Sequence, residues 1–159
     1  MTQKSHSQEQ RVAVFPGTFD PFTIGHADIV ERGLEIFDRV AICVGVNISK
    51  PKDRQSAERR VQAIERVYAG NDRVSVHCWS GLTAEFALSI GARHLLRGVR
   101  SVKDNDYERD MAEANREMFG LDTVVLFTDP KLAYVSSSLV RELVAHGQDV
   151  SRFLPKADV

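Results

Sequence analysis

The chain of 159 residues carries 21 Lys and Arg against 22 Asp and Glu, a net charge of −1, and 43% of its residues are hydrophobic. This length suits one compact domain, and a near-neutral charge argues against a protein that coats nucleic acid, which would usually be basic overall. Because no apolar run is long enough to span a bilayer, we expect a cytoplasmic protein with neither nucleic acid nor a membrane as partner.

The N-terminal segment MTQKSHSQEQ is polar and has no apolar stretch of the kind that a signal peptide contains. We expect residues 1–10 to form a disordered tail and residues 11–159 to form one domain. Cys43 and Cys78 lie in apolar segments without CxxC spacing or a nearby pair of histidines, so we expect reduced, buried thiols.

Short apolar runs rich in β-branched residues alternate with longer stretches of helical periodicity. The predicted strands cover residues 11–15, 39–46, 74–78, 94–97 and 123–127. The predicted helices cover residues 26–37, 56–68, 82–90, 107–118 and 137–146, with Ser56 as the expected N-cap of the second helix. This alternation predicts an α/β fold, a single doubly wound (Rossmann-like) domain with a five-stranded parallel sheet flanked by helices. Ligands of such sheets bind at the carboxyl ends of the strands, where the strand order reverses.

The first strand is followed by a glycine-containing loop, and His26 is predicted to open the next helix. A helix N-terminus preceded by such a loop offers free N–H groups and the positive end of the helix dipole, which suits a phosphate. The loop has neither the GxxxxGK[ST] nor the GxGxxG pattern. His26 could donate a ring N–H to a phosphate oxygen, or it could be a partly exposed histidine that caps the helix.

Two arginines, Arg97 and Arg100, lie at the carboxyl end of the fourth predicted strand with a glycine between them. Arginines at the end of a central strand are costly unless an anion pairs with them. That anion could be a polyphosphate, or it could be one of the acidic side chains just downstream, Asp104, Asp106 or Glu108.

Further hydroxyl and cationic groups follow two other predicted strands. The serines at 136–138 start the last helix, where they could cap the helix or cradle a phosphate. Lys50 follows the second strand, as an exposed loop residue or as a phosphate ligand. Four strand ends thus bring cations, hydroxyls or helix N-termini to one rim, which together predict a bound polyphosphate.

Two segments carry a resemblance to a known superfamily. Thr23-Ile24-Gly25-His26 resembles the T/H-x-G-H signature of the nucleotidyltransferases, and the segment VSSSLVR at 135–141 resembles their second, ISSTxxR-like signature. The superfamily includes cytidylyltransferases, nicotinate-mononucleotide adenylyltransferases and class I aminoacyl-tRNA synthetases, so these signatures indicate chemistry before substrate. PGTFDPFTIGH, NISKP, SGLT and RGVRSVKDNDYERDMAEANREM are similar, in order and spacing, to bacterial phosphopantetheine adenylyltransferases across nearly the whole chain after residue 10.

The resemblance implies transfer of AMP from ATP to 4′-phosphopantetheine, giving dephospho-CoA and pyrophosphate in coenzyme A biosynthesis. The acceptor phosphate would attack the α-phosphorus directly and in line, and it needs no general base because it is already anionic at neutral pH. Mg²⁺ would be carried mainly by the ATP phosphates, with no metal site on the chain itself. The resemblance also implies a homohexamer, and it raises feedback by coenzyme A, which the sequence alone does not specify.

The roles that the resemblance implies fall on three groups of residues. Those expected to act in catalysis are His26, Lys50 and Arg97. Those expected to hold the acceptor are Thr18, Lys50, Thr83 and Arg97. Those expected to bind ATP are Thr18, Phe19, His26, Gly98, Val99, Arg100, Glu108, Leu132, Ala133, Tyr134, Val135, Ser136, Ser137 and Ser138. Asn105, Pro130 and Leu132 depart from the family pattern.

Two alternatives remain open at this point. One is an adenylyl- or cytidylyltransferase for another phosphate, such as nicotinamide mononucleotide or glycerol 3-phosphate. The other is a nucleotide-sensing protein that binds without turnover.

Overall fold

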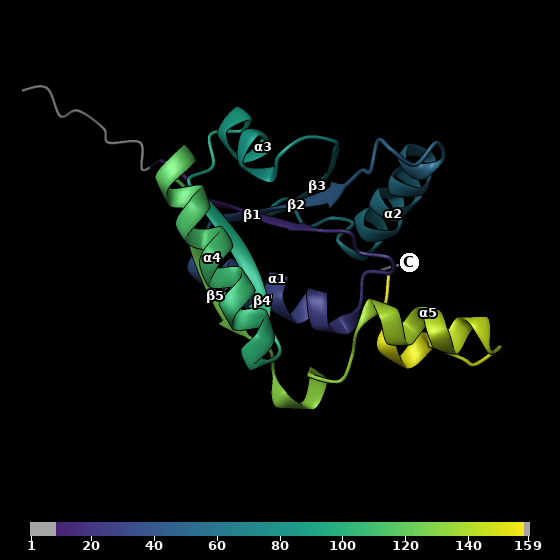
Figure 1. Cartoon of the computed structure of the whole chain (residues 1–159). Helices are drawn as coiled ribbons and strands as arrows, with labels where there is room; N and C mark the ends of the chain where they lie inside the picture. The colour runs from purple at the N-terminus through teal and green to yellow at the C-terminus, as the bar shows by residue number, and fades with distance from the viewer. Residues whose placement is uncertain (1–8, 158–159) are drawn as a thin grey trace, which may run out of the picture.

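The computed structural model describes residues 9–157, so most of the expected N-terminal tail, residues 1–8, lies outside the described residues. Within residues 9–157, five parallel strands alternate with five α-helices in a single α/β domain, as the sequence predicts (Figure 1). None of the helices in this range is both long and apolar enough to cross a membrane.

The strands form one sheet in the order β3-β2-β1-β4-β5. Their bounds are β1 Val12–Gly17, β2 Arg39–Gly45, β3 Val74–Trp79, β4 His94–Val99 and β5 Asp122–Phe127. From β1 at the centre, β2 and β3 follow on one side of the sheet, and β4 and β5 follow on the other. The strand order therefore reverses between β1 and β4. These two strands pair only at Ala13 with His94 and Val14 with Leu95, and both continue beyond this pairing. The sheet therefore opens between their carboxyl ends.

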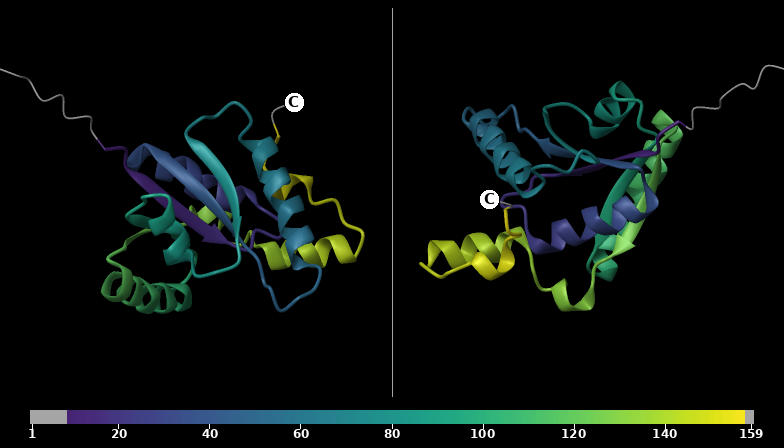
Figure 2. Two further views of the ribbon diagram at one scale, coloured as in Figure 1. Left: turned by 90° about the horizontal axis from the view of Figure 1, so that it is seen from above. Right: turned by 180° about the vertical axis from the view of Figure 1, so that it is seen from behind.

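The α-helices cover both faces of the sheet (Figure 2). Their bounds are α1 Ile24–Ile36, α2 Asp53–Val67, α3 Thr83–Ser89, α4 Val102–Phe119 and α5 Ser137–Ala145. Helices α1 and α2 pack with one face of β1 and β2 around Val30 and Ile64, whereas α3 and the end of α4 pack against the other face around Phe86. Burying both faces explains why β2 is apolar throughout its centre.

The C-terminal part of the chain lies beyond the strand ends. Two short 3₁₀ helices, η1 Pro130–Leu132 and η2 Ser151–Phe153, flank α5, and Phe153 packs with Val140 of α5 in a small separate core. The C-terminal segment thus folds back beside α5, as Figures 1 and 2 both show. This arrangement holds the start of α5 next to the open edge between β1 and β4.

Two predicted helix starts near the site were wrong. Helix α1 begins at Ile24, because the side chain of Thr23 accepts a hydrogen bond from the His26 N–H and caps the helix two residues earlier than predicted. Helix α4 begins at Val102 instead of residue 107, because Ser101 caps it by accepting from the Asp104 N–H at 3.3 Å.

The predicted start of α2 was also wrong, since α2 begins at Asp53 and Ser56 lies inside its first turn. Asp53 in this first turn interacts favourably with the helix dipole, which a prediction based on apolar periodicity does not detect. Both cysteines are free, and the prediction that they are buried is right for Cys43 and wrong for Cys78. Cys43 is buried, which raises its pKa to about 12, whereas Cys78 is only half-buried.

Candidate active site

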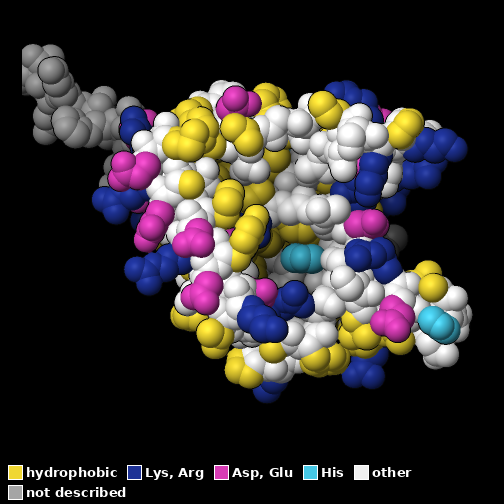
Figure 3. All heavy atoms as spheres, viewed as in Figure 1, with side chains coloured by type: hydrophobic (Ala, Val, Ile, Leu, Met, Phe, Trp, Pro, Cys, Tyr) yellow, Lys and Arg dark blue, Asp and Glu magenta, His cyan; other side chains and the backbone are white. Residues whose placement is uncertain are grey.

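Two cavities open where β1 and β4 diverge. Cavity A, of about 310 Å³, lies among the β1–α1 loop, the end of β4 and the start of α5. Cavity B, of about 500 Å³, lies between the end of β1, the start of α3 and one side of α4. Pro16, Gly17, Arg97 and Glu108 line both cavities, so A and B adjoin at these residues. On the face shown in Figure 3, a hollow contains a histidine and has Lys, Arg, Asp and Glu side chains around it.

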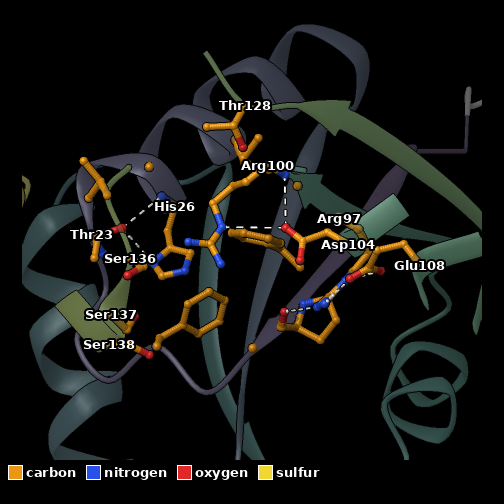
Figure 4. Close-up of a pocket in the computed structure, with 18 residues that line it drawn as sticks. Thr23, His26, Arg97, Arg100, Asp104, Glu108, Thr128, Ser136, Ser137 and Ser138 are labelled. Carbon is orange, nitrogen blue, oxygen red and sulfur yellow. Dashed lines mark hydrogen bonds and ion pairs between the residues drawn. The ribbon is translucent and has the colours of Figure 1, made fainter. Parts of the chain in front are cut away.

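The boundary between the cavities contains a two-point ion pair. The Nε and one terminal nitrogen of Arg97 donate to the two carboxylate oxygens of Glu108 at 2.8 and 2.6 Å, and the other terminal nitrogen donates to the Pro16 carbonyl at 2.8 Å (Figure 4). The Glu108 side chain is 8% exposed and that of Arg97 is 30% exposed. These three bonds use three of the five N–H donors of the guanidinium, so two remain for an anion.

His26 is oriented by the residue that caps its helix. The backbone N–H of Thr23 donates to Nδ1 of His26 at 2.9 Å, and the Thr23 hydroxyl lies 3.1 Å from the same nitrogen. Because Nδ1 accepts the backbone hydrogen bond, the neutral ring carries its proton on Nε2. Thr23 and His26 together form a capping box, and Nε2–H is left as the donor of a side chain that lines cavity A.

The surroundings of His26 keep its ring neutral. Its pKa is lowered from 6.5 to about 4, first by burial and then by the charges of Arg100 and Arg97. The ring stacks on Phe22 with ring centroids 5.4 Å apart. The ring of Phe19 lies nearly perpendicular to it, with ring centroids 5.0 Å apart. A neutral imidazole that lines this cavity is suited to donating a hydrogen bond and not to accepting a proton as a base.

Arg100 is the less tightly paired of the two arginines in cavity A. Its Nε lies 3.8 Å from Asp104, and its side chain is 46% exposed. In Figure 4 the guanidinium of Arg100 lies between the ring of His26 and the carboxylate of Asp104. Arg97 therefore pairs with Glu108 and Arg100 with Asp104, two of the acidic side chains that the sequence offered as alternatives to an anion. Both arginines also line cavity A.

The start of α5 closes the other side of cavity A. Ser136 caps α5 by accepting from the Leu139 N–H at 3.1 Å, and Ser137 donates its hydroxyl proton to the Pro21 carbonyl at 2.8 Å. All three serines at 136–138 line cavity A. Capping and anion binding are thus compatible here, because the first N–H groups of α5 remain available at the helix N-terminus.

Cavity B has a different character from cavity A. Thr18 and Thr83 line it from the β1–α1 loop and the start of α3. Met111, Asn115 and Phe119 line it from successive turns of α4, at a spacing of four residues. This face of α4 was not predicted from the sequence, although a spacing of four residues along a helix is a signal that could have indicated it. Cavity B therefore combines polar groups near Arg97 with a largely apolar wall.

The structure brings most of the expected site residues to these two cavities. Those that line cavity A are Phe19, His26, Arg97, Gly98, Arg100, Glu108, Val135, Ser136, Ser137 and Ser138. Those that line cavity B are Thr18, Thr83, Arg97 and Glu108. Those that line neither cavity are Lys50, Val99, Leu132, Ala133 and Tyr134. Lys50 is exposed in the loop beyond β2, and Val99 is buried at the end of β4.

Comparison with known proteins identifies the relatives of this chain. Residues 14–143 match the family model described as cytidylyltransferase-like. The phosphopantetheine adenylyltransferase of Porphyromonas gingivalis is 50% identical over 151 residues, which are 95% of this chain and 98% of the relative.

Solved structures of lower identity share the fold. A putative nicotinate-nucleotide adenylyltransferase from Vibrio parahaemolyticus aligns with a TM-score of 0.63 at 19% identity, over 93% of this chain and 95% of the other. A bifunctional NMN adenylyltransferase/ADP-ribose pyrophosphatase from Francisella tularensis, complexed with AMP and a manganese ion, aligns with a TM-score of 0.65 at 18% identity. That alignment covers 94% of this chain and 46% of the Francisella chain.

Proposed function

The chain belongs to the phosphopantetheine adenylyltransferases of the cytidylyltransferase-like family, and we propose that it transfers AMP from ATP to 4′-phosphopantetheine, giving dephospho-CoA and pyrophosphate. The observation that carries this proposal beyond the family is the pair of cavities that adjoin at Arg97. A reaction that joins two large substrates through their phosphates needs two pockets that meet at a cationic group. This step belongs to coenzyme A biosynthesis.

ATP is assigned to cavity A. The start of α5 and the arginines at 97 and 100 offer N–H donors and positive charge to its phosphates. Gly98 lies at the wall, where an added Cβ would come within 2.9 Å of Ile29, so a side chain there would need Ile29 to shift. The segment 132–135, which precedes the serines, is proposed to contact the adenosine part of ATP, together with Val99.

The acceptor is assigned to cavity B. Its phosphate would lie beside Arg97, and the pantetheine arm would extend past Thr83 along the apolar face of α4 at Met111 and Phe119. Thr18 lines cavity B next to Gly17, which lines both cavities, and this supports the proposal that Thr18 contacts both substrates. Lys50 is proposed to reach the acceptor phosphate from the neighbouring β2–α2 loop.

The proposed chemistry is a direct in-line displacement. An oxygen of the acceptor phosphate attacks the α-phosphorus of ATP, the bond to the bridging oxygen breaks, and pyrophosphate leaves with the electron pair. No proton has to be removed from the nucleophile at neutral pH. The task of the protein is therefore to align the two phosphates and to stabilise negative charge, with Arg97 on the acceptor and Nε2–H of His26 on the reacting phosphate.

Glu108 is proposed to act on ATP through Arg97. Its two carboxylate oxygens are both occupied by the guanidinium, and its side chain is 8% exposed. The carboxylate of Glu108 would repel the negatively charged triphosphate if its own charge were not neutralised. The ion pair with Arg97 limits this repulsion. The same pair fixes the plane of the guanidinium between the two cavities.

Mg²⁺ is proposed to enter with ATP. Among residues 9–157 no group of three or more His, Cys, Asp and Glu side chains is arranged to hold a metal ion. The ion would thus be held mainly by phosphate oxygens, and we propose that Asp104, which lines cavity A, contacts its hydration shell. When bound, the ion would neutralise charge on the phosphates.

The wider setting of the enzyme is proposed from the family alone. We propose a cytoplasmic homohexamer that binds ATP and 4′-phosphopantetheine and responds to coenzyme A as a feedback inhibitor. Sedimentation equilibrium tests the oligomeric state, and a dimeric or monomeric protein at micromolar concentration would exclude the hexamer.

The decisive experiment measures pyrophosphate release from ATP and Mg²⁺ with a panel of acceptors. We expect release with 4′-phosphopantetheine and far less with nicotinamide mononucleotide or glycerol 3-phosphate, because these acceptors lack the pantetheine arm that would extend along the apolar wall of cavity B. Preference for another acceptor would refute phosphopantetheine as the substrate but would leave the proposed type of reaction in place. Binding of ATP without release for any acceptor would favour the nucleotide-sensing alternative.

A further inference from the structure

Arg60 is a buried arginine outside the residues that line cavities A and B. It lies on α2, is 8% exposed, and uses its guanidinium within the protein. One terminal nitrogen donates to the Thr18 carbonyl, and the other lies 3.3 Å from a carboxylate oxygen of Asp53. Its Nε also donates to the Ser56 carbonyl, one turn earlier on α2, at 3.4 Å. Because burying a cation is costly, the two partners beyond that turn, Thr18 and Asp53, indicate what it does.

The first group controls the β1–α1 loop. The Thr18 carbonyl belongs to the peptide that precedes Phe19, and Phe19 has a φ of +51°, in the left-handed region that is unfavourable for a residue with a side chain. In this conformation the Phe19 ring lies over Gly17, where an added Cβ would come within 2.8 Å of the ring, and it meets His26 edge-on. The bond from Arg60 to Thr18 therefore stabilises an unfavourable turn that helps to place His26.

The second group shapes the β2–α2 loop. Asp53 accepts a hydrogen bond from the Asn47 N–H on its other carboxylate oxygen. Its own N–H donates to the Lys50 carbonyl at 3.0 Å, and the Lys50 N–H donates to the Asn47 carbonyl at 3.1 Å. The loop that carries Lys50 is thus folded around the same carboxylate that pairs with Arg60.

We propose that the Arg60–Asp53 pair is a positioning device that sets the β1–α1 loop against the β2–α2 loop, so that Thr18 and Lys50 meet the same acceptor phosphate. This inference rests on the proposed function for its kinetic consequences. Arg60 lines neither cavity, so it acts through Thr18 and Phe19 on one side and through Asp53 on the other.

The kinetic test compares Arg60→Met with Arg59→Met. Arg59 is the exposed neighbour on the same helix, so its substitution is the matched control. We expect Arg60→Met to lower kcat/KM for phosphopantetheine by about 10- to 100-fold, because a small misplacement of aligned groups has effects of this size. We expect the Kd for ATP, measured by calorimetry without acceptor, to change by no more than about threefold, because the groups at the start of α5 are untouched.

A second readout requires no substrate. A pH titration of the His26 ring by NMR should give a pKa near 4 in the unsubstituted protein and in Arg59→Met. In Arg60→Met the Phe19 ring is released, His26 becomes more hydrated, and its pKa should move toward 6.5 although Arg97 and Arg100 still face it. This titration separates the two proposals, because it reports on the loop even if phosphopantetheine is not the acceptor.

The inference is overturned if folded Arg60→Met matches Arg59→Met in both measurements, or if it loses ATP binding as much as acceptor turnover. Should Arg60→Met fail to fold, Arg60→Lys and Asp53→Asn decide the matter. Lys keeps the charge beside Asp53 but lacks the planar fork that reaches two acceptors, so an intermediate loss of acceptor kcat/KM is expected. Unchanged kinetics in both of these variants would refute the positioning role.

Discussion

Replacing His26 with glutamine should make the protein more resistant to acid. Glutamine cannot be protonated in this range, whereas the unsubstituted protein holds His26 neutral in a buried site beside Arg97 and Arg100. The native pKa of about 4 lies below the ordinary value of 6.5, so between these values the unfolded chain binds more protons at this position than the native protein. The free energy of unfolding must therefore fall as the pH falls from 6.5 toward 4.

The size of this effect follows from the two pKa values. The lowering from 6.5 to about 4 corresponds to about 3 kcal/mol at 1.36 kcal/mol for each pKa unit. At pH 5 the native ring is still mostly neutral while the unfolded one is mostly charged, so about 2 kcal/mol of this is already lost relative to pH 7.5. Most carboxylates remain ionised at pH 5, so the loss is mainly due to histidine.

The assay is urea denaturation of the unsubstituted protein and of His26→Gln at pH 7.5, 6 and 5, at one fixed protein concentration. We expect the free energy of unfolding of the unsubstituted protein to decrease by about 2 kcal/mol more than that of the variant between pH 7.5 and 5. Parallel pH profiles for the two proteins would refute the argument, because they would show that His26 titrates normally in the native state.

Four further predictions concern single side chains. His26→Ala should lower kcat by about 10²- to 10³-fold, the cost of one donor to a developing charge, while the Kd for ATP changes little; an equal loss of ATP binding in calorimetry would contradict this role. Lys50→Ala should raise the KM for phosphopantetheine before it affects kcat, and an unchanged KM would argue against its proposed contact. Glu108→Gln should lower kcat/KM for ATP and for the acceptor by about 10- to 100-fold, since Arg97 lines both cavities and one charge-assisted bond to it is worth about 1.5–3 kcal/mol; steady-state kinetics at wild-type level would show that the pair is dispensable. Ser136→Ala should reduce the free energy of unfolding by about 1 kcal/mol through loss of the α5 N-cap, and denaturation curves that superimpose with and without the substitution would contradict it.

The alternation of strands and helices could be predicted from the sequence because each buried strand is a compact apolar run between breakers. The starts of α1, α2 and α4 could not, whereas the start of α5 at Ser137 was predicted correctly. The first turns of α2 and α4 are almost entirely polar, so apolar periodicity begins later than the helix does. In both cases the start is determined by local groups, Asp53 in the first turn of α2 and Ser101 at the N-cap of α4, whose contribution depends on backbone geometry.

The residues that line cavity A could be predicted where a signature marks a helix N-terminus, as at His26 and Ser136. Arg60 was not predicted as a buried residue, because arginines in a charged helix usually face solvent. A signal was nevertheless present: Ala57, Arg60 and Ile64 lie at spacings of three and four, so Arg60 shares the buried face of α2 with two apolar residues. A charged residue on the buried face of an amphipathic helix needs a partner, and here the partners are Thr18 and Asp53.

The choice between an anion and an acidic side chain as partner of Arg97 could not be made from sequence spacing. The structure shows the acidic side chain, Glu108, and in the proposed reaction the two partners are compatible. Glu108 occupies two donors of Arg97 and Pro16 a third, which leaves two donors and a fixed plane at the boundary of the two cavities. An unpaired arginine could turn into either cavity and leave the other without a cation. The ion pair weakens the net charge at the boundary but holds the guanidinium where two substrate phosphates would meet, and alignment of those phosphates is what an in-line transfer without a general base requires.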